Sequence, residues 1–311
     1  MTLRLSPAEI DRAAKLIRKG ELVAFPTETV YGLGASIFQP EAIQKIFRVK
    51  GRPQDNPLIA HIAHLNQIPL LAKEIPKDVE RLVSLFFPGP LTLVLEKRKE
   101  VPPIVSGGGS TIALRMPKHP VALALIAEVG DPLVAPSANL SGRPSSTEFS
   151  HVWEDFEGKI SAIIDGGPCT IGLESTVLSL VDKEPQLLRP GAITREQLEE
   201  ALGKKIEVPD PDSFEKPPSP GMKYKHYAPR AKVLLFSDRE AIEVYVQRYP
   251  FAFRQVVEPT ADNLYASLRK ADLMGCLEVL VLCDERVQAN AALFNRLTRA
   301  ASLPMDSDHW D

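Results

Sequence analysis

The chain has 311 residues, of which 44% are hydrophobic and 25% are charged, and its formal net charge is −3. These values are typical of a soluble globular protein, and the length suggests two domains that each form a core without disulfides. Seven charged residues among the first twenty exclude a secretory signal, and no apolar stretch reaches the roughly 20 residues that span a bilayer. The cysteines Cys169, Cys276 and Cys283 have no paired spacing, which fits a reducing cytoplasm and disfavours zinc. We therefore expect a cytoplasmic protein with no membrane association and no dedicated metal site.

The first predicted element is a helix that begins after Ser6. Ser6 and Glu9 have the spacing of a capping box, Pro7 occupies the first helical position, and Gly20 ends the helix. Strand-length apolar runs then alternate with helical patterns. The runs fall at Leu22–Phe25, Leu58–Ile62, Leu91–Leu95, Thr111–Met116, Leu133–Ala135, Ile160–Ile164 and Thr176–Val181, and the helical patterns near residues 40–49, 77–87, 119–129 and 194–202. This alternation predicts an α/β domain over residues 1–207.

Proline marks the boundary that follows this domain. Six of the 28 prolines lie between Val208 and Pro229, so we interpret residues 208–230 as an extended linker. The stretch from Lys216 to Lys232 has five cations and no acid, which suits a lid over phosphates or a contact with RNA. A small α/β domain is predicted over residues 231–311, with strands at Lys232–Phe236 and Glu278–Cys283 and helices at 239–248, 261–272 and 287–300.

Two segments of the first domain carry groups that suit a polyanion. The segment Lys45–His61 holds four cations and one acid, with Lys50 and Arg52 on either side of a glycine. Cations beside flexible backbone suit phosphate, although a basic turn that complements the helix dipole explains this segment equally well. The segment Ala135–Ser145 offers hydroxyl and amide groups, but an ordinary turn is the favoured interpretation for that segment alone.

Three further positions present polar groups on or beside predicted strands. Arg115 needs an anionic partner unless it is exposed at a strand end. Ser175 and Arg189 also lie at strand ends, where they can serve a site or be exposed to solvent. His61 closes an apolar strand, where a core imidazole would be the better interpretation. No serine lies in a G-x-S-x-G elbow, and Cys169 has no flanking histidine. The remaining chemistry is the binding and orientation of a polyanion, which is mostly what nucleotidyl transfer requires.

At these motifs the sequence resembles a known family. Lys50-Gly-Arg52 together with Ser137-Ala-Asn139 resembles the KxR…SxN signature of the YrdC-like family, and PTETVYGLG at residues 26–34 resembles its opening loop. SPGMKYKHYAP at residues 219–229 is similar to the linker of the family's long, two-domain form. The resemblance implies a twisted, mixed α/β sheet with helices around a basic cavity. It also implies a small Rossmann-like C-terminal α/β domain, for which the roughly 80 residues after the linker are fewer than expected.

The resemblance also implies an activity and its residues. The implied nucleotidyltransferase converts L-threonine, bicarbonate or CO2, and ATP with Mg2+ into threonylcarbamoyl-AMP and pyrophosphate. A separate transferase then uses the product to make N6-threonylcarbamoyladenosine in tRNA. The implied catalytic residues are Lys50 and Arg52; those for ATP are Lys50, Arg52, Asn56, Thr111, Ser137, Asn139, Ser145, Arg189 and Tyr227, and those for threonine are Thr29, Tyr31, His61, Arg115, Ala135 and Ser175, with Thr29 against Tyr31 left open.

The competing hypothesis is an RNA-binding, translation-associated module without catalysis. Such a module would use the same cations to hold RNA phosphates. The overall negative charge argues against it, because a sequence-independent RNA binder usually has a basic domain.

Overall fold

The structure, a computed structural model, describes residues 1–210, 227–303 and 305. Among these, residues 1–141 and 146–210 form one compact unit, and residues 142–145 and 227–303 form a second. The short loop 142–145 therefore packs with residues far from it in sequence. Most of the predicted linker 208–230, including the proposed lid, lies outside the described residues, so the lid stays a prediction.

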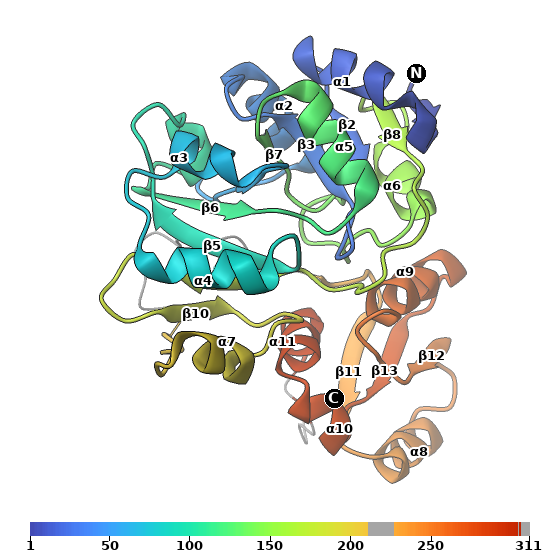
Figure 1. Cartoon of the computed structure of the whole chain (residues 1–311). Helices are drawn as coiled ribbons and strands as arrows, with labels where there is room; N and C mark the ends of the chain where they lie inside the picture. Colours follow the sequence, from blue (N-terminus) through green and yellow to red (C-terminus); the bar gives the residue numbers. More distant parts are fainter. Residues whose placement is uncertain (211–226, 304, 306–311) are drawn as a thin grey trace. The chain divides into compact units, whose positions relative to one another are not determined.

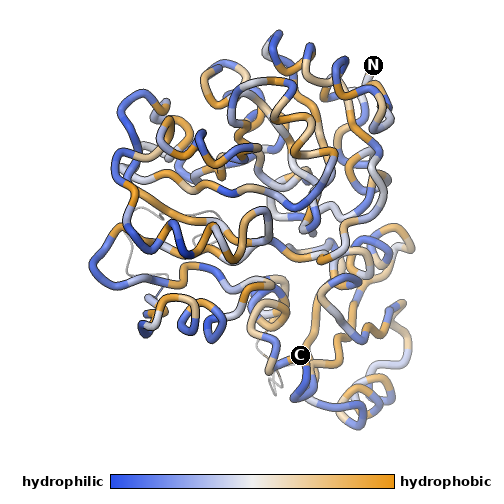
Figure 2. The backbone as a smooth tube through the Cα atoms, in the orientation of Figure 1, coloured by the Kyte–Doolittle hydropathy of each residue, from blue (hydrophilic) through white to orange (hydrophobic). Residues whose placement is uncertain are grey.

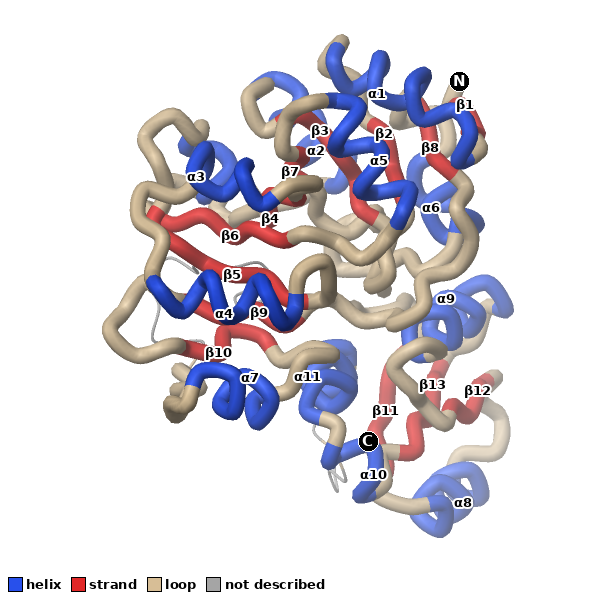
Figure 3. Tube along the Cα trace, in the orientation of Figure 1, coloured by secondary structure: helices blue, strands red, loops and turns tan. Residues whose placement is uncertain are grey.

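A single mixed sheet organises the first unit. Its strands are β1 (Leu3–Leu5), β2 (Val23–Phe25), β3 (Gly32–Ser36), β4 (Ile59–His61), β5 (Leu91–Glu96), β6 (Thr111–Arg115), β7 (Leu133–Val134), β8 (Ala162–Ile164), β9 (Thr176–Ser179) and β10 (Gln186–Arg189). They are ordered β1-β8-β2-β3-β7-β4-β6-β5-β9-β10 (Figure 3). The β4–β6 and β5–β9 pairs are parallel, whereas β5–β6 and β9–β10 are antiparallel. The predicted mixed α/β fold is confirmed.

Helices cover this sheet where their apolar faces can be buried. They are α1 (Ile10–Arg18), α2 (Pro40–Lys50), α3 (Ile68–Leu71), α4 (Lys77–Phe86), α5 (Pro120–Val129), α6 (Phe149–Phe156) and α7 (Arg195–Leu202). The predicted capping box of Ser6 and Glu9 is present at the 3-10 turn that leads into α1. Figure 1 shows α1 beside α5, and the two helices are in contact.

The central strands β4, β5, β6 and β9 bury residues on both faces. Leu93 and Leu114 belong to the main core, which also takes in residues of α2 and α4. The alternate positions form a smaller cluster on the opposite face: Ile59, Val94, Ala113, Val177 and Leu188. Because successive strand side chains point to opposite faces, a polar residue two positions from a member of this cluster lies on the same face. Figure 2 shows these strands as largely hydrophobic segments.

Some strands were not predicted from the sequence. β3 was missed because its sequence, GLGAS, has no long apolar run. A Cβ at Gly34 would lie 2.8 Å from the Phe25 ring, so close packing against β2 requires glycine there. The short strand β1 and helix α6 were also not predicted from the sequence.

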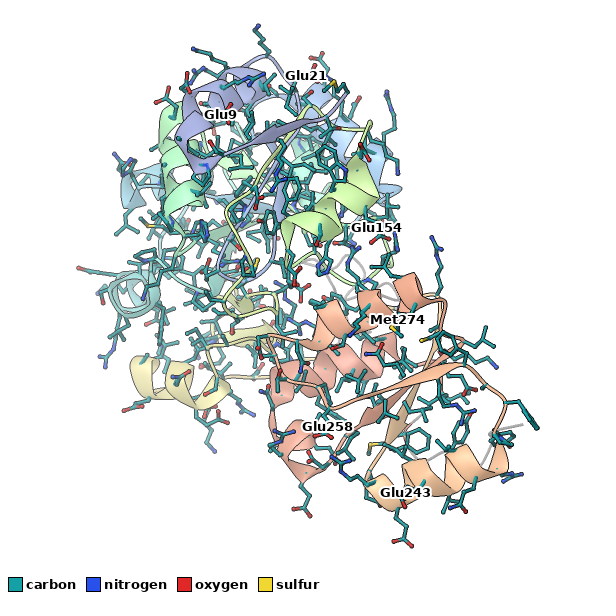
Figure 4. All side chains as sticks on the ribbon, turned by 90° about the vertical axis from the view of Figure 1, so that its right-hand side faces the viewer. Glu9, Glu21, Glu154, Glu243, Glu258 and Met274 are labelled. Atoms are coloured by element: carbon teal, nitrogen blue, oxygen red, sulfur yellow. The ribbon has the colours of Figure 1, made fainter. Side chains whose placement is uncertain are left out.

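The second unit contains a three-stranded parallel sheet. Strands β11 (Lys232–Phe236), β12 (Arg254–Val257) and β13 (Glu278–Leu282) are ordered β11-β13-β12. The helices of this unit are α8 (Arg239–Arg248), α9 (Leu264–Met274), α10 (Glu285–Ala289) and α11 (Ala291–Ala300). Glu243 on α8 and Glu258 after β12, both labelled in Figure 4, line a cavity of about 480 Å³. The predicted C-terminal α/β domain is confirmed.

No helix among the described residues is both long and apolar enough to cross a membrane.

Candidate active site

One face of the central strands carries several of the polar residues that the sequence singled out. His61 lies two residues after Ile59, and Arg115 two residues after Ala113, so both share the face of the smaller apolar cluster. His61 and Arg115 are also register partners across β4 and β6. Ser175, two residues before Val177, lies on the same face. Residues far apart in sequence therefore meet over one part of the sheet.

Arg115 is buried and has protein partners at three of its nitrogens. Its Nη1 donates to the hydroxyl of Thr29 at 2.8 Å, and its Nε donates to the carbonyl of Gly89 at 3.1 Å. Its Nη2 lies 2.6 Å from a carboxylate oxygen of Glu28, and both side chains are almost fully buried. The sequence predicts an anionic partner for Arg115 but does not identify Glu28 as that partner. Glu28 could have been suspected from its position between Thr27 and Thr29 in the opening loop.

The structure distinguishes Thr29 from Tyr31. Thr29 contacts Arg115 directly and also lies 2.9 Å from the hydroxyl of Thr27. The Tyr31 ring belongs to the main core, and its hydroxyl donates to the carbonyl of Gly167 at 2.7 Å. Burial raises the pKa of this hydroxyl, so Tyr31 stays a neutral packing residue. Of the two alternatives, Thr29 is the one beside Arg115.

His61 is neutral at physiological pH. Burial, and secondarily the positive charge of Arg115, lowers the pKa of the imidazole to about 3. Its Nδ1 lies 3.2 Å from the carbonyl of Ile59, and its ring stands edge-on to Phe25. An uncharged imidazole therefore lies beside the Arg115 guanidinium.

Ser175 and Arg189 form a second group on this face. The Ser175 hydroxyl lies 2.7 Å from the hydroxyl of Thr92, which the sequence analysis did not select. Arg189 donates to the Ser175 carbonyl at 3.0 Å and to its hydroxyl at 3.2 Å. The resemblance assigned Arg189 to ATP and Ser175 to threonine, so the fold joins one residue from each set.

Lys50 connects the two signature motifs. It is the last residue of α2, which ends because Gly51 adopts a left-handed φ of 62°. The buried Lys50 ammonium donates to the carbonyl of Ser137 at 2.7 Å and also to that of Asn139. In return, the Lys50 carbonyl accepts from the amide of Ser141 at 2.9 Å. The KxR and SxN loops therefore lie side by side.

The remaining residues assigned to ATP in the first unit gather near this junction. Arg52 curls over its own loop and donates to the carbonyls of Asn56 at 3.3 Å and Pro57 at 2.8 Å. The amide of Leu58 donates to the carbonyl of Val105 at 2.9 Å, which packs the Asn56 loop against the segment leading to Thr111. Cations and neutral polar groups thus occupy neighbouring loops.

Ala135 follows β7 in the first unit, and its amide donates to the carbonyl of Ile59 at 3.1 Å.

Ser145 and Tyr227 belong to the second unit, where the guanidinium of Arg269 on α9 donates twice to the carbonyl of Pro144, at 2.8 and 3.1 Å. Tyr227 stacks on Tyr265 of the same helix with ring centroids 5.5 Å apart. Helix α9 therefore holds the segments that carry both residues.

The site lacks an activated thiol. Burial raises the pKa of Cys169 to about 12, so this residue stays a protonated thiol. Within the described part of the chain, no group of three or more His, Cys, Asp or Glu side chains is placed to hold a metal ion. The arrangement suits binding of an amino acid near Arg115 and of phosphates near Lys50 and Arg52.

Comparison with known proteins agrees with this arrangement. The family described as Telomere recombination, which groups Sua5, YciO and YrdC, matches residues 15–191. The family described as Threonylcarbamoyl-AMP synthase, C-terminal domain, matches residues 193–302. The first unit also resembles the E. coli YciO structure, with 26% identity and a TM-score of 0.55 over 62% of this chain and 96% of that one.

Full-length relatives are also found. The threonylcarbamoyl-AMP synthase of Pyrococcus abyssi is 44% identical over 96% of this chain and 95% of its own length. That of Bacillus subtilis is 43% identical over 96% and 94%. The crystal structure of P. abyssi Sua5 complexed with L-threonine has a TM-score of 0.90 at 40% identity and covers 97% of both chains.

The mixed sheet and the joined motif loops, together with these matches, show that the chain belongs to the Sua5/YciO/YrdC family of α/β proteins. Within that family it has the two-domain form, whose relatives over nearly the full chain are threonylcarbamoyl-AMP synthases. The predicted membership is confirmed.

Proposed function

We propose that this chain is an L-threonylcarbamoyladenylate synthase, a nucleotidyltransferase that acts on L-threonine, bicarbonate or CO2, and ATP. The observation that carries the proposal is the meeting of Arg115, Thr29 and His61 on one sheet face in a chain similar over almost its full length to threonylcarbamoyl-AMP synthases. A buried guanidinium suits the substrate carboxylate. The product would supply a separate transferase that forms N6-threonylcarbamoyladenosine in tRNA.

The proposed reaction needs no protein nucleophile. The threonine amine adds to CO2, forming a C–N bond and releasing a proton, and gives a carbamate. A carbamate oxygen then attacks the α-phosphorus of ATP, and pyrophosphate leaves with the electrons of the broken P–O bond. The protein's task is to orient the carbamate and the triphosphate in line. The protonated thiol of Cys169 is consistent with this direct attack.

The phosphates would lie near Lys50 and Arg52, with Asn56, Ser137 and Asn139 as neutral partners. This donor set supplies positive charge and neutral dipoles. Mg2+ bound with ATP would then be held mainly by phosphate oxygens and water, the coordination that this ion prefers beside nucleotides. We place the enzyme in the cytoplasm, a reducing compartment, in keeping with its three buried cysteines.

Pyrophosphate release is expected only when ATP, Mg2+, L-threonine and bicarbonate are all present, because the carbamate is the attacking group. A coupled pyrophosphate assay, with each component omitted in turn, measures this dependence. Equal release without threonine would reject the proposal. Calorimetric titration with ATP and with RNA distinguishes the enzyme from the RNA-binding alternative, which predicts RNA binding without ATP binding.

Replacing Arg189 with alanine is expected to weaken ATP binding by roughly 10- to 150-fold, the effect of losing a charge-assisted hydrogen bond. Threonine affinity should fall less, through the loss of the Arg189 contacts to Ser175. Arg189→Lys keeps the charge but not the planar fork, so it should recover only part of the ATP affinity. Unchanged ATP affinity in Arg189→Ala would remove this residue from the nucleotide site.

A further inference from the structure

Glu28 is a buried acid in contact with the candidate amino-acid site, and no role has yet been assigned to it. Only 5% of the residue is exposed, and one carboxylate oxygen lies 2.6 Å from Nη2 of Arg115. Within the described chain, neither carboxylate oxygen accepts a hydrogen bond, and Nη2 of Arg115 donates none. The contact is therefore an ion pair without hydrogen-bond alignment. A carboxylate can accept about four hydrogen bonds. Both oxygens of the buried Glu28 carboxylate can therefore still accept hydrogen bonds from a ligand.

The backbone fixes the direction of Glu28. Its carbonyl accepts a hydrogen bond from the amide of Ile171 at 2.8 Å. On either side, the hydroxyl of Thr27 accepts from the amides of Thr29 at 3.2 Å and Val30 at 3.3 Å. These hydrogen bonds hold the loop in the conformation that buries the Glu28 carboxylate.

The other titratable groups near Glu28 do not neutralise it. Burial lowers the pKa of His119, which keeps this imidazole uncharged at neutral pH, and its Nδ1 is buried without a partner in the described structure. The nearby Cys169 stays protonated. Arg115 is thus the charged neighbour of Glu28 on this face, and it also serves Thr29 and Gly89.

Arg115 keeps donors for a ligand. A guanidinium has five N–H groups, and the contacts of Arg115 with described residues engage three of its nitrogens, one partner each. Each Nη atom has two hydrogens, of which Nη1 uses one on Thr29 and Nη2 uses neither in a hydrogen bond to a described residue. A substrate carboxylate can use these hydrogens while Glu28 stays in place.

A guanidinium and a carboxylate side by side form the charge complement of an amino-acid zwitterion. Within the proposed function, on which this inference rests, we propose that Glu28 binds the α-ammonium group of threonine while Arg115 binds its carboxylate. Filling the unused acceptors of Glu28 with ammonium N–H groups would relieve the desolvation cost of the buried acid. Glu28 is then a substrate-binding residue that selects amino acids over other carboxylic acids.

The test is a calorimetric titration with three ligands. L-Threonine has the ammonium, carboxylate and hydroxyl groups; 3-hydroxybutyrate lacks the ammonium group, and 1-aminopropan-2-ol lacks the carboxylate. Glu28→Gln should weaken binding of threonine and 1-aminopropan-2-ol by roughly 10- to 150-fold, the effect of one charge-assisted hydrogen bond. Binding of 3-hydroxybutyrate should not weaken, because this ligand has no ammonium group for Glu28 to bind and its carboxylate is repelled by the Glu28 charge.

Two further variants complete the design. Glu28→Asp keeps the charge but withdraws the carboxylate by one methylene, so it should lower threonine affinity selectively even if the glutamine variant folds poorly. Asp131→Asn is the matched control, because Asp131 is a part-buried acid that accepts from Ser36 at 2.7 Å at the far end of β3. It should leave all three affinities unchanged.

The outcomes separate the two proposals. Wild-type protein that binds no threonine rejects the proposed function itself. Wild-type threonine binding with equal losses for threonine and 3-hydroxybutyrate in both Glu28 variants shows a purely structural role and overturns the assignment. Unchanged affinities in both variants overturn it as well.

Discussion

Replacing Arg115 with methionine is expected to lower the free energy of unfolding by about 3–5 kcal/mol, the cost of leaving one partner of a buried ion pair alone. The Arg115 and Glu28 side chains are only 4% and 6% exposed, so water cannot solvate the remaining carboxylate. The variant also loses donors to Thr29 and Gly89. Methionine fills similar volume, which limits the contribution of a cavity.

Urea unfolding of the single and double variants measures this effect. Arg115→Met combined with Glu28→Gln should recover most of the lost stability, because the double variant has no buried charge at this position. Arg4→Met is the control: Arg4 pairs with Asp165 at the same 2.6 Å, but the two side chains are 65% and 27% exposed. A surface pair of this kind contributes about 0–1 kcal/mol. Equal losses in Arg115→Met and Arg4→Met would contradict the buried-pair argument.

The second large effect is a loss of stability in mild acid caused by His61. Its pKa is about 3 in the folded protein because the imidazole is buried beside Arg115, whereas an unfolded histidine titrates near 6.5. Below pH 6.5 the unfolded chain therefore binds more protons, and stability falls by about 1.4 kcal/mol per pH unit until about pH 3. Between pH 6.5 and 4.5 this residue should account for about 2 kcal/mol, because the full slope is reached only well below the unfolded pKa.

The measurement is the unfolding free energy of wild type and His61→Gln between pH 6.5 and 4.5. Carboxylates and His119 titrate in both proteins, so the difference between the two slopes isolates His61. His64→Gln replaces an exposed histidine and is the control for removing one histidine from the chain. Parallel pH profiles for wild type and His61→Gln would show that His61 is accessible to protons in the folded state.

Local sequence patterns were sufficient for elements that rely on their own residues. The capping box of Ser6 and Glu9 formed at the predicted place, because both partners are three residues apart. Gly51 ends α2 in a left-handed conformation. By contrast, β3 escaped prediction, since its glycines are explained by the Phe25 ring of a neighbouring strand.

The candidate site shows the same division. The motif loops supplied Lys50, Arg52, Ser137 and Asn139, but only the fold shows that the Lys50 ammonium binds the carbonyls of the SxN loop. The sequence did not distinguish Thr29 from Tyr31, because both hydroxyl residues lie in the same loop and their order in the chain does not show which one contacts Arg115. Burial of the Tyr31 ring in the main core makes that distinction.

By itself, the sequence determined the α/β class, the family resemblance and the residue types of the site, because each depends on local periodicity or on short motifs. Only the tertiary structure decided the pairing of Arg115 with Glu28, the link between Ser175 and Arg189, and the neutrality of His61. These properties depend on distances between strands and on the exclusion of water. Neither quantity is encoded in the spacing of residues along the chain, because both arise when distant segments pack against each other.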